Sequence, residues 1–360
     1  MSKKILMLCS PGYYKKTGYY YRAIRDKVAL ENLGNIVDLL VLKGWVSAFK
    51  TFLVLLVNAE KNERYVCQNI GSVIPLFFAS YFKPKILENT ILIYHGSLED
   101  LIAFRFYKAK RFFYELIEAR LVELGSTFVC VSHSMRFGLE KKYKNSELKC
   151  HVLPNIPSPD FIRNIEAAKE INKSNLRSEL KIPQDKIIIC YSGNAQAWQN
   201  VEFLFNVFLD MPDEFHLLIL TIDSRKMNEL KEQYKIPDCR ITLRTVDNIQ
   251  VPKYLVAADY LYIVREQSEI NEYSCPTKAV EYLYSGTKII CSENLGDISS
   301  FVLVNKLGII ISKINMKNIN LIRSMIVEDS FRVNELLRSE INLDSMFGTN
   351  LQNDVYRLII

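Results

Sequence analysis

Several features that would assign a sequence to a common class of protein are missing here. The 360 residues contain no run of 18 uncharged apolar residues, which is about the length that a helix needs to cross a bilayer. The best candidate, 46–58, is too short and contains Lys50. At the N-terminus, basic residues precede an apolar run of about six residues, which is shorter than the apolar region of a signal peptide and is interpreted as a first β-strand.

Metal-site and redox patterns are also missing. None of the eight cysteines is paired as C-x-x-C, and five lie in or beside apolar, strand-like runs (Cys9, Cys67, Cys130, Cys190 and Cys291). Such cysteines are typical of small buried side chains in a reducing compartment, so we expect a cytoplasmic protein. The four histidines lack metal-ligand spacing and no D-x-D triplet occurs, so we expect neither a metal nor a cofactor.

Motifs of three large enzyme classes are absent. There is no G-x-G-x-x-G fingerprint, no Walker A sequence and no G-x-S-x-G elbow, which disfavours a dehydrogenase, a P-loop kinase and a hydrolase of that class. No zinc-finger spacing, RNP motif or basic-region heptad supports a nucleic-acid partner.

The charge is unevenly distributed. The first 160 residues carry 23 Lys+Arg against 14 Asp+Glu, or +9, whereas the remainder carries 23 against 26, or −3. Such an asymmetry indicates that the first half faces an anion, and a membrane surface or a phosphorylated lipid would fit.

Short apolar runs alternate with amphipathic segments along the chain. This alternation predicts parallel sheets, and the runs rich in Ile and Val are expected to be strands buried on both faces. The predicted strands are 4–10, 36–42, 64–69, 90–95, 127–132, 150–154, 186–193, 215–221, 240–246, 260–264, 287–292 and 308–311. The predicted helices are 17–34, 99–124, 134–143, 200–210, 224–235, 251–258, 277–285 and 314–326.

Two domains are the natural expectation at this length. The stretch 151–186 is rich in proline, asparagine and charge, and the strand–helix pattern restarts at Ile187, so a boundary is predicted there. We expect two doubly wound α/β domains at 1–160 and 165–340, with ligand bound in the cleft that faces the carboxyl ends of their strands. A C-terminal helix at about 345–360 is expected to pack back onto the first domain.

The segment SCPTKAVEYLYSG (274–286) carries the strongest chemical signal. Proline suits the first position of a helix, so Thr277 and Lys278 would follow with free backbone N–H groups and a positive charge, an arrangement that binds anions such as a diphosphate. Glu281, about one turn further in, could accept hydrogen bonds from a ribose diol. A capped helix with a solvated lysine and a surface glutamate fits the same residues, and both interpretations stay open.

The wider region 257–297 resembles the donor-binding region of retaining glycosyltransferases of family 4, which have the GT-B fold. It is most similar to the subgroup found in bacterial surface-polysaccharide clusters, where a Pro-x-Lys-x-x-Glu-Tyr-Leu stretch precedes a Gly-x-x-hydrophobic strand. The resemblance extends to VCVSHSM and HVLPN at the end of the first domain, to IIICYSGNAQAWQN at the start of the second, and more faintly to SPGYYKKTGYYYRAI. It covers most of residues 1–300.

This resemblance implies a GT-B enzyme whose two Rossmann-like domains face a central cleft, with the second domain binding a nucleotide sugar. The residues expected to bind the donor nucleotide and its diphosphate are Gly193, Asn194, Ser274, Pro276, Thr277, Lys278 and Glu281. The residues expected to act in catalysis are His95, Arg265 and Lys278.

Two departures from the family pattern affect the donor site. A sugar-contacting glutamate is usual at the position of Tyr273, and Glu272 lies one residue out of register, so that role is unassigned here. A basic residue usually follows the glycine of the first loop, where this sequence has Asn194. We expect Arg265, at the end of its strand, and Lys278 to supply the missing charge, with an ion pair to a neighbouring acid as the alternative for Arg265.

The acceptor or donor sugar is expected to contact the first domain. Gly12 and Gly18 lie between the first strand and the first helix, where they permit close backbone approach to a ligand. His95 ends a predicted strand and precedes Gly96; the resemblance suggests that it lines the sugar and acceptor site, and a structural hydrogen bond fits nearly as well. Glu272, in the second domain, is also expected to contact the acceptor or the donor sugar.

A helix at 101–124 interleaves aromatic and aliphatic residues with Arg105, Lys108, Lys110 and Arg111. A basic face beside an aromatic one is typical of helices that lie on anionic membranes, so we expect peripheral association with the inner membrane face. A core helix with an ordinary solvated side is the alternative.

The resemblance implies a retaining, metal-independent glycosyltransferase that uses a nucleotide-diphosphate sugar. The expected acceptor is a lipid-linked glycan or oligosaccharide, most simply an undecaprenyl-diphosphate-linked one, in synthesis of a capsule, O-antigen or similar polysaccharide. Two alternatives stay open. One is an inverting GT-B or epimerase-like enzyme with His95 or Glu99 as base, and the other is a catalytically degenerate partner protein with the same fold.

Overall fold

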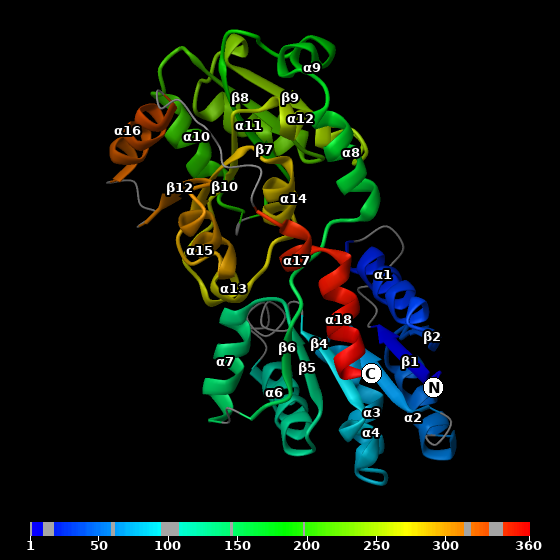
Figure 1. Cartoon of the computed structure of the whole chain (residues 1–360). Helices are drawn as coiled ribbons and strands as arrows, with labels where there is room; N and C mark the ends of the chain where they lie inside the picture. The colour runs from blue at the N-terminus through cyan, green and yellow to red at the C-terminus, as the bar shows by residue number, and fades with distance from the viewer. Residues whose placement is uncertain are drawn as a thin grey trace. The chain divides into compact units, whose positions relative to one another are not determined.

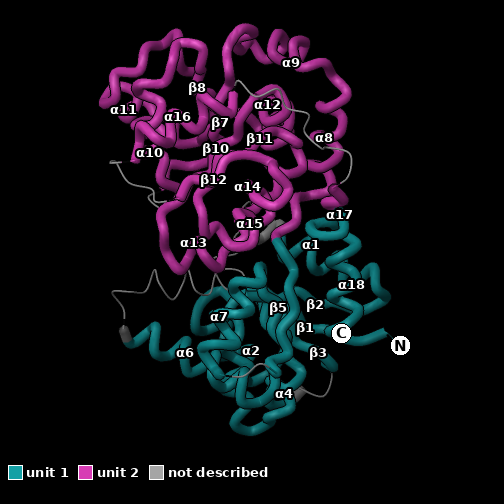
Figure 2. Tube along the Cα trace, turned by 60° about the vertical axis from the view of Figure 1, so that its left-hand side comes forward, with its two compact units in different colours: residues 1–154, 344–360 teal, residues 155–343 magenta. Residues whose placement is uncertain are grey.

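The chain forms two compact units, each with its own parallel sheet. Unit 1 comprises residues 1–154 and 344–360, and unit 2 comprises residues 155–343 (Figure 2). The computed structural model describes residues 2–9, 18–58, 62–94, 108–144, 147–196, 199–312, 318–330 and 341–360.

The sheet of unit 1 has six parallel strands in the order β2-β1-β3-β4-β5-β6 (Figure 1). β4 is buried along its whole length, as its unbroken apolar sequence predicts. The strands are β1 (Lys4–Cys9), β2 (Ile36–Val41), β3 (Arg64–Cys67), β4 (Thr90–Tyr94), β5 (Thr127–Cys130) and β6 (Cys150–Val152). The helices are α1 (Gly18–Asn32), α2 (Trp45–Asn58), η2 (Ile70–Val73), α3 (Ile74–Ser80), α4 (Lys85–Glu88), α6 (Lys108–Glu123), α7 (His133–Tyr143) and α18 (Thr349–Ile359), and α17 (Leu343–Phe347) leads back from unit 2.

The strand order assigns the helices of unit 1 to two faces of its sheet. The chain steps from β1 to β2 in one direction and from β2 through β3 and β4 to β5 in the other. Since such crossovers are right-handed, α2, α3 and α6 lie on one face and α1 lies on the opposite face. α2 packs against α3, α3 against α6, and α1 against α18.

The C-terminal helix is attached to α1 by a buried carboxylate. Asp26 of α1 is fully buried and accepts a hydrogen bond from Gln352 of α18 at 2.8 Å. Its second oxygen accepts one from Gln68, just after β3, at 3.0 Å. Because a buried carboxylate is unfavourable unless it is hydrogen-bonded, these amides fix α18 in register on α1.

The sheet of unit 2 also has six parallel strands, in the order β12-β11-β10-β7-β8-β9. β8 and β11 are buried throughout, with α10 covering one face through Leu204, Phe205 and Phe208. The strands are β7 (Ile187–Ser192), β8 (Phe215–Leu220), β9 (Ile241–Arg244), β10 (Tyr260–Ile263), β11 (Lys288–Ser292) and β12 (Gly308–Ile311). The helices are α8 (Pro159–Lys169), α9 (Lys173–Leu180), α10 (Val201–Leu209), α11 (Ser224–Gln233), η5 (Asp238–Arg240), α12 (Val251–Ala257), α13 (Glu269–Tyr273), α14 (Thr277–Ser285), α15 (Gly296–Val304) and α16 (Ile319–Ser330).

The boundary between the two units lies between 154 and 155, within the stretch 151–186 in which it was predicted. The rest of this stretch contains α8 and α9, which were not predicted; they follow side-chain caps at Ser158 and Asn172 and pack against α12. Unit 2 therefore starts at 155 rather than near 165. The segment between β10 and α14 also contains a helix, α13, which is capped by Ser268.

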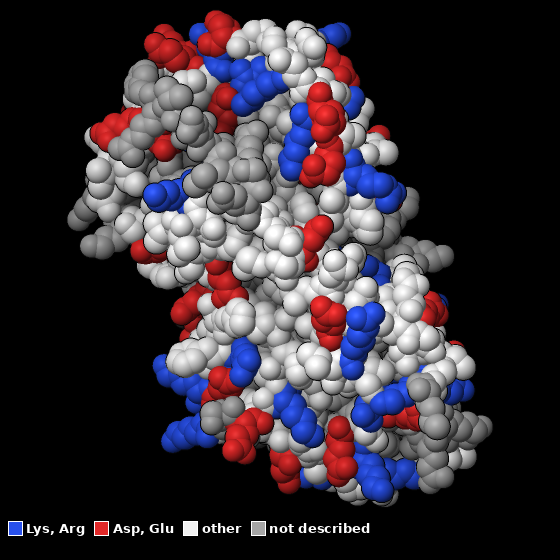
Figure 3. Space-filling model, viewed as in Figure 1, with Lys and Arg blue, Asp and Glu red and all other residues white. Residues whose placement is uncertain are grey.

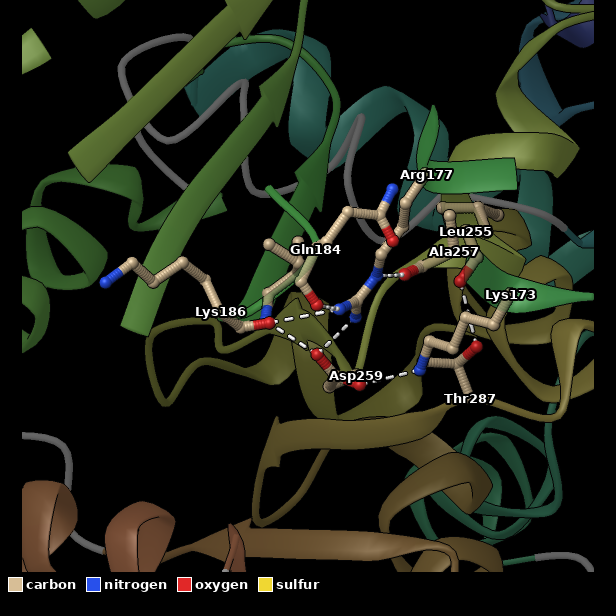
Figure 4. Close-up of polar contacts among 9 residues, drawn as sticks. Lys173, Arg177, Gln184, Lys186, Leu255, Ala257, Asp259 and Thr287 are labelled. Carbon is tan, nitrogen blue, oxygen red and sulfur yellow. Dashed lines mark hydrogen bonds and ion pairs between the residues drawn. The ribbon is translucent and has the colours of Figure 1, made fainter. Parts of the chain in front are cut away.

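A buried arginine connects α9 to the start of the unit 2 sheet (Figure 4). Arg177 donates to the carbonyl oxygens of Ala257, Gln184 and Lys186 at 3.0–3.2 Å and to the Asp259 carboxylate at 2.6 Å. Asp259 also accepts the backbone N–H of Ile188 at 2.7 Å. One ion pair thus aligns the amino-terminal ends of β7 and β10, and it lies at the opposite end of these strands from the site described below.

We predict that Asp259→Ala destabilises the protein by about 3 kcal/mol, because it removes the carboxylate that pairs with the buried Arg177 and leaves the Ile188 N–H without its acceptor. The matched control is Glu179→Ala, which removes the carboxylate of an exposed pair with Lys253 and should cost less than about 1 kcal/mol. Urea unfolding followed by circular dichroism measures both. Equal losses for the two variants would contradict a structural role for Asp259.

Candidate functional site

The strand order of unit 2 has a switch point between β7 and β10. The chain leaves β7 toward β8 on one side and leaves β10 toward β11 on the other, although β7 and β10 are neighbours. In open α/β sheets, ligands bind outside the carboxyl ends of the strands at such a point. The loop after β7 contains Gly193, and the segment after β10 leads through Arg265 to α14, so the predicted donor residues converge there.

Lys278, in the first turn of α14, reaches across the switch point to Gly193. A Cβ atom on Gly193 would lie 1.7 Å from the Lys278 ammonium, and the φ of +155° at this position also favours glycine. The ammonium lies 5.2 Å from the centre of the Tyr191 ring. It is buried and has no hydrogen-bond acceptor among the residues that the structure describes. The glycine therefore provides the space for an ammonium that has no hydrogen-bond acceptor among the described residues.

The amino terminus of α14 adds further donors. Pro276 is the N-cap, one position earlier than the sequence suggested, and α14 starts at Thr277. The N–H groups of Ala279 and Val280 donate to the Pro276 carbonyl. The N–H groups of Thr277 and Lys278 donate to no residue within the described ranges. An anion placed here would meet two N–H groups, a helix dipole and an ammonium.

Arg265 brings a second cation to the same place. It is buried at the end of β10, where its N–H donates to the Ser292 hydroxyl at 3.1 Å. Its guanidinium donates to the Asn271 side chain at 3.3 Å, and Asn271 in turn donates to the Glu266 carbonyl at 2.8 Å. One partner of Arg265 is thus an amide, and repulsion by Arg265 lowers the pKa of Lys278. The alternative of an ion pair between Arg265 and a neighbouring acid stays a prediction.

Burial and these charges shift two pKa values toward neutrality. Burial, together with repulsion by Arg265, lowers the pKa of Lys278 from 10.5 to about 8, against the attraction of Glu281. Burial raises the pKa of Glu281 from 4.5 to about 7, against the attraction of Lys278. Glu281 accepts no hydrogen bond from the described residues. The folded protein therefore holds both side chains where their charged forms are unfavourable, and a ligand that pairs with them could remove this free-energy cost. Such pKa shifts are characteristic of functional sites.

Residues outside the predicted set fix the loop after β7 against α14 and against the loop after β8. Tyr191 donates its hydroxyl to the Asn194 carbonyl at 2.5 Å, and Tyr282 of α14 accepts the Ser192 N–H at 3.1 Å. Asp223 accepts the Ala195 N–H at 2.8 Å. The side-chain oxygen of Asn194 is buried without a donor among the described residues, so it too is available to a ligand.

The loop between α13 and α14 is held from two sides. The Ser274 hydroxyl donates to the Asn271 carbonyl at 2.9 Å, and Asn155 donates to the Cys275 carbonyl. Gly296, at φ +51°, packs so closely that a Cβ atom there would lie 1.9 Å from the Ser274 carbonyl oxygen. Ser274 is thus engaged within the loop, and its contact with a nucleotide stays a prediction.

Of the remaining predicted residues, the structure describes only Glu272 and Gly18. Glu272 lies exposed on α13, and Gly18 begins α1 in unit 1. Gly12, His95 and Gly96 lie outside the described residues, as does Glu99. Their roles stay predictions. Within the described ranges no group of three His, Cys, Asp or Glu side chains could hold a metal, and no helix is long and apolar enough to cross a membrane.

We predict opposite pH dependences of stability for the two shifted groups. Between pH 4.5 and 7 the folded protein holds more protons on Glu281 than the unfolded chain does, so stability falls as the pH rises through this window. Relative to Glu281→Gln, the free energy of unfolding of the native protein should fall by up to about 3 kcal/mol between pH 4.5 and 7. Between pH 8 and 10.5 the folded protein holds fewer protons on Lys278, so relative to Lys278→Met it should gain stability. Chemical unfolding across pH measures both, and parallel curves for native and variant proteins would contradict the burial of these charges.

Comparison with known proteins identifies the fold. No protein-family model matches the chain, and no curated protein sequence does. Sucrose-phosphate synthase from Thermosynechococcus elongatus is 14% identical and aligns over 99% of each chain with a TM-score of 0.72. WaaG, a glycosyltransferase involved in lipopolysaccharide biosynthesis, is 14% identical and aligns over 98% of this chain and 99% of its own (TM-score 0.70). HepE from Anabaena, in complex with UDP and glucose, is 13% identical over 99% of this chain and 98% of its own (TM-score 0.69). Together with the two parallel six-stranded sheets, these similarities confirm the predicted fold class: the chain has the GT-B fold.

Proposed function

We propose that the protein is a glycosyltransferase that uses a nucleotide-diphosphate sugar as donor. The observation that carries this proposal is the Lys278 ammonium, buried over Gly193 without an acceptor among the described residues. It lies beside Arg265 and next to the two unengaged N–H groups of α14. A site with two cations and two free N–H groups, in which Glu281 attracts Lys278 without forming an ion pair with it, is suited to a diphosphate.

The same groups would stabilise a departing diphosphate. When the bond between the sugar and the diphosphate breaks, negative charge accumulates on the leaving oxygen. Preorganised donors that face this oxygen lower the barrier without having to reorient. A bound diphosphate would raise the pKa of Lys278 from about 8, so the ammonium would keep its proton during this step.

Glu281 is proposed to hold the ribose. It lies one turn after Lys278 on the same helix, and its carboxylate accepts no hydrogen bond from the described residues. Two ribose hydroxyl groups would supply the missing donors and would favour the ionised carboxylate, lowering its pKa from about 7. The buried side-chain oxygen of Asn194 offers an acceptor to a further ligand hydroxyl or amino group.

The structural relatives support this choice of ligand. HepE has been determined in complexes with UDP and glucose, with UDP and with UDP-glucose, and it aligns with this chain along nearly its whole length. The starch synthase IV catalytic domain from Arabidopsis thaliana, in complex with ADP and acarbose, also aligns. Different bases occur among these relatives, so we propose the nucleoside diphosphate as the shared ligand.

The finer proposals come from the family resemblance. We propose retention by front-face displacement, in which the departing diphosphate assists deprotonation of the acceptor hydroxyl and no enzyme nucleophile is needed. We propose a lipid-linked glycan acceptor in bacterial surface-polysaccharide synthesis and a reaction that needs no metal. Positive charge from Lys278 and Arg265 would then take the place of a divalent ion at the diphosphate.

We predict that one of UDP, GDP, CDP, ADP and dTDP raises the melting temperature of the protein in the presence of EDTA, by mass action on the folded state. Lys278→Ala should weaken that diphosphate by about 10- to 100-fold, because a charge-assisted contact is lost. Gly193→Ala should also weaken it, because the new methyl group displaces the ammonium.

Lys253→Ala, which changes an exposed lysine of α12, is the matched control and should bind as the native protein does. A folded sample that responds to none of the five diphosphates would contradict the proposed donor site and would favour a degenerate partner protein. Equal affinity in Lys278→Ala would remove Lys278 from the site.

We predict that the nucleotide sugar carrying the identified base donates its sugar to a polyprenyl-diphosphate-linked acceptor in EDTA with retention of anomeric configuration. Release of the nucleoside diphosphate follows the rate, and the anomeric coupling constant of the product gives the stereochemistry. An inverted product would overturn retention and favour the inverting alternative, and activity only after addition of a divalent ion would overturn metal independence.

A further inference from the structure

The helix α2 exposes an apolar surface that the proposed reaction does not use. Trp45 is 70% exposed, Phe49 60% and Val57 78%, and these belong to an arc that extends along the whole helix. The exposed apolar residues of this arc are Trp45, Val46, Phe49, Leu53, Val54 and Val57. The opposite side of α2 is buried through Ala48, Thr51 and Leu55. Apolar helix surfaces of this extent are normally covered by protein or lipid, and the described residues leave the outer side of α2 uncovered.

The neighbouring helix extends this surface. α3 packs against α2 on the same face of the unit 1 sheet (Figure 1). Phe78 of α3 is also exposed, and so are Tyr81 and Phe82, the two residues that follow this helix. We refer to these three residues and the arc of α2 together as the α2–α3 apolar surface.

The segments that carry the α2–α3 apolar surface are basic. The segments 42–58 and 68–87, which contain both helices, carry four lysines and no aspartate or glutamate, and the exposed Glu88 follows the second segment directly. Lys43, Lys50 and Lys85 are exposed, and none forms an ion pair among the described residues. On the face drawn in Figure 3, basic and acidic side chains are interspersed on both units.

We propose that the α2–α3 apolar surface docks the protein onto an anionic lipid bilayer. Apolar side chains would enter the boundary between headgroups and acyl chains while the unpaired lysines contact lipid phosphates. An aromatic residue at the start of α2 and two after α3 suit this boundary, because such rings favour the interface between water and lipid.

Lys50 distinguishes a bilayer from a second copy of the chain. It lies within the exposed arc of α2, flanked by Val46, Phe49, Val54 and Val57. A protein partner seated on this arc would bury its ammonium among apolar groups, and a symmetric pair would bring two such charges close together. At a bilayer the flexible side chain extends to the headgroups while its methylene groups stay in the apolar layer.

The helix expected to bind a membrane from its sequence, at 101–124, is less suited to this role in its described part. Arg111 of α6 pairs with Glu115 at 2.9 Å, and Arg120 pairs with Glu123 at 2.7 Å. Of the four basic residues on which the expectation rested, Arg111 is the one that the structure pairs in this way, so that expectation stays a prediction. The side chains of residues 101–108 lie outside the described part of the chain.

Fluorescence of Trp45 tests the proposal. The sequence has two tryptophans, so Trp198→Phe leaves Trp45 as the only one. On vesicles of phosphatidylethanolamine and phosphatidylglycerol, its emission should shift to shorter wavelength and become protected from acrylamide. Vesicles of phosphatidylcholine alone should bind more weakly, and Lys50→Gln should lower partitioning into the anionic vesicles by about fivefold.

Matched double variants locate the surface. Phe49→Glu with Val54→Glu should lower co-sedimentation with the anionic vesicles by at least about tenfold, because two inserted apolar groups become charged. Leu303→Glu with Val304→Glu makes the same change on α15 of unit 2, where both residues are also exposed, at 64% and 77%, and should bind as the native protein does. Melting temperature and size-exclusion chromatography confirm that both variants are folded.

Three results would overturn the proposal. They are native protein that does not bind the anionic vesicles, equal binding by the α2 variant, and a native dimer that the α2 variant converts to a monomer, which would assign the surface to a second copy. Vesicle binding is read without donor or acceptor, whereas the diphosphate melting shift reads unit 2 alone. Failure of one is therefore distinguishable from failure of the other.

Discussion

A buried ammonium without a hydrogen-bond acceptor is unfavourable, and the loops of unit 2 hold the Lys278 ammonium where the described residues offer it none. Gly193 leaves the space that a methyl group would fill, and the Tyr191 ring offers the charge only a weak cation–π contact. Arg265 adds repulsion rather than relief. The folded state retains this arrangement because the surrounding loops are fixed by hydrogen bonds that do not involve the ammonium, such as that from the Ser192 N–H to Tyr282. Binding energy that would otherwise have stabilised the empty protein is thereby reserved for an anion.

In the proposed donor site, the positive charge does not come from the loop after β7, where the family resemblance would place a basic residue. Here that loop presents the neutral Asn194 and a glycine. Both cations come from the β10 side of the switch point, one from the strand end and one from the helix that follows it. Because β7 and β10 are adjacent strands, a charge contributed by either can occupy the same space at their carboxyl ends. Residues that follow β10 can therefore supply the positive charge that a basic loop after β7 would otherwise provide there.

Some of this was accessible from the sequence, and the reasons differ from element to element. Runs such as 90–95 and 215–221 are apolar enough to be strands only in a parallel sheet, and α14 has the predicted bounds because proline precedes it and glycine follows it. The helices α8 and α9 were not predicted because their caps, Ser158 and Asn172, are the same residue types that occur in linkers. The contact between the Ser192 N–H and Tyr282 could not be inferred, because it joins segments 90 residues apart whose proximity depends on the strand order rather than on local sequence.

The exposed apolar surface of α2 also could not be predicted from the sequence, because it depends on which side of the helix packs against unit 1. Hydropathy along the sequence counts every apolar residue of 46–58 alike, and on that measure Lys50 and the short length only exclude insertion across a bilayer. The fold separates these residues into a side that packs on unit 1 and a side that faces outward, which hydropathy alone cannot do. Once Ala48, Thr51 and Leu55 are assigned to the core, the remaining residues form an apolar arc with a lysine inside it. That lysine excludes a helix that crosses the bilayer, and it favours one that lies at the bilayer surface, because the headgroup phosphates are within reach of its side chain there.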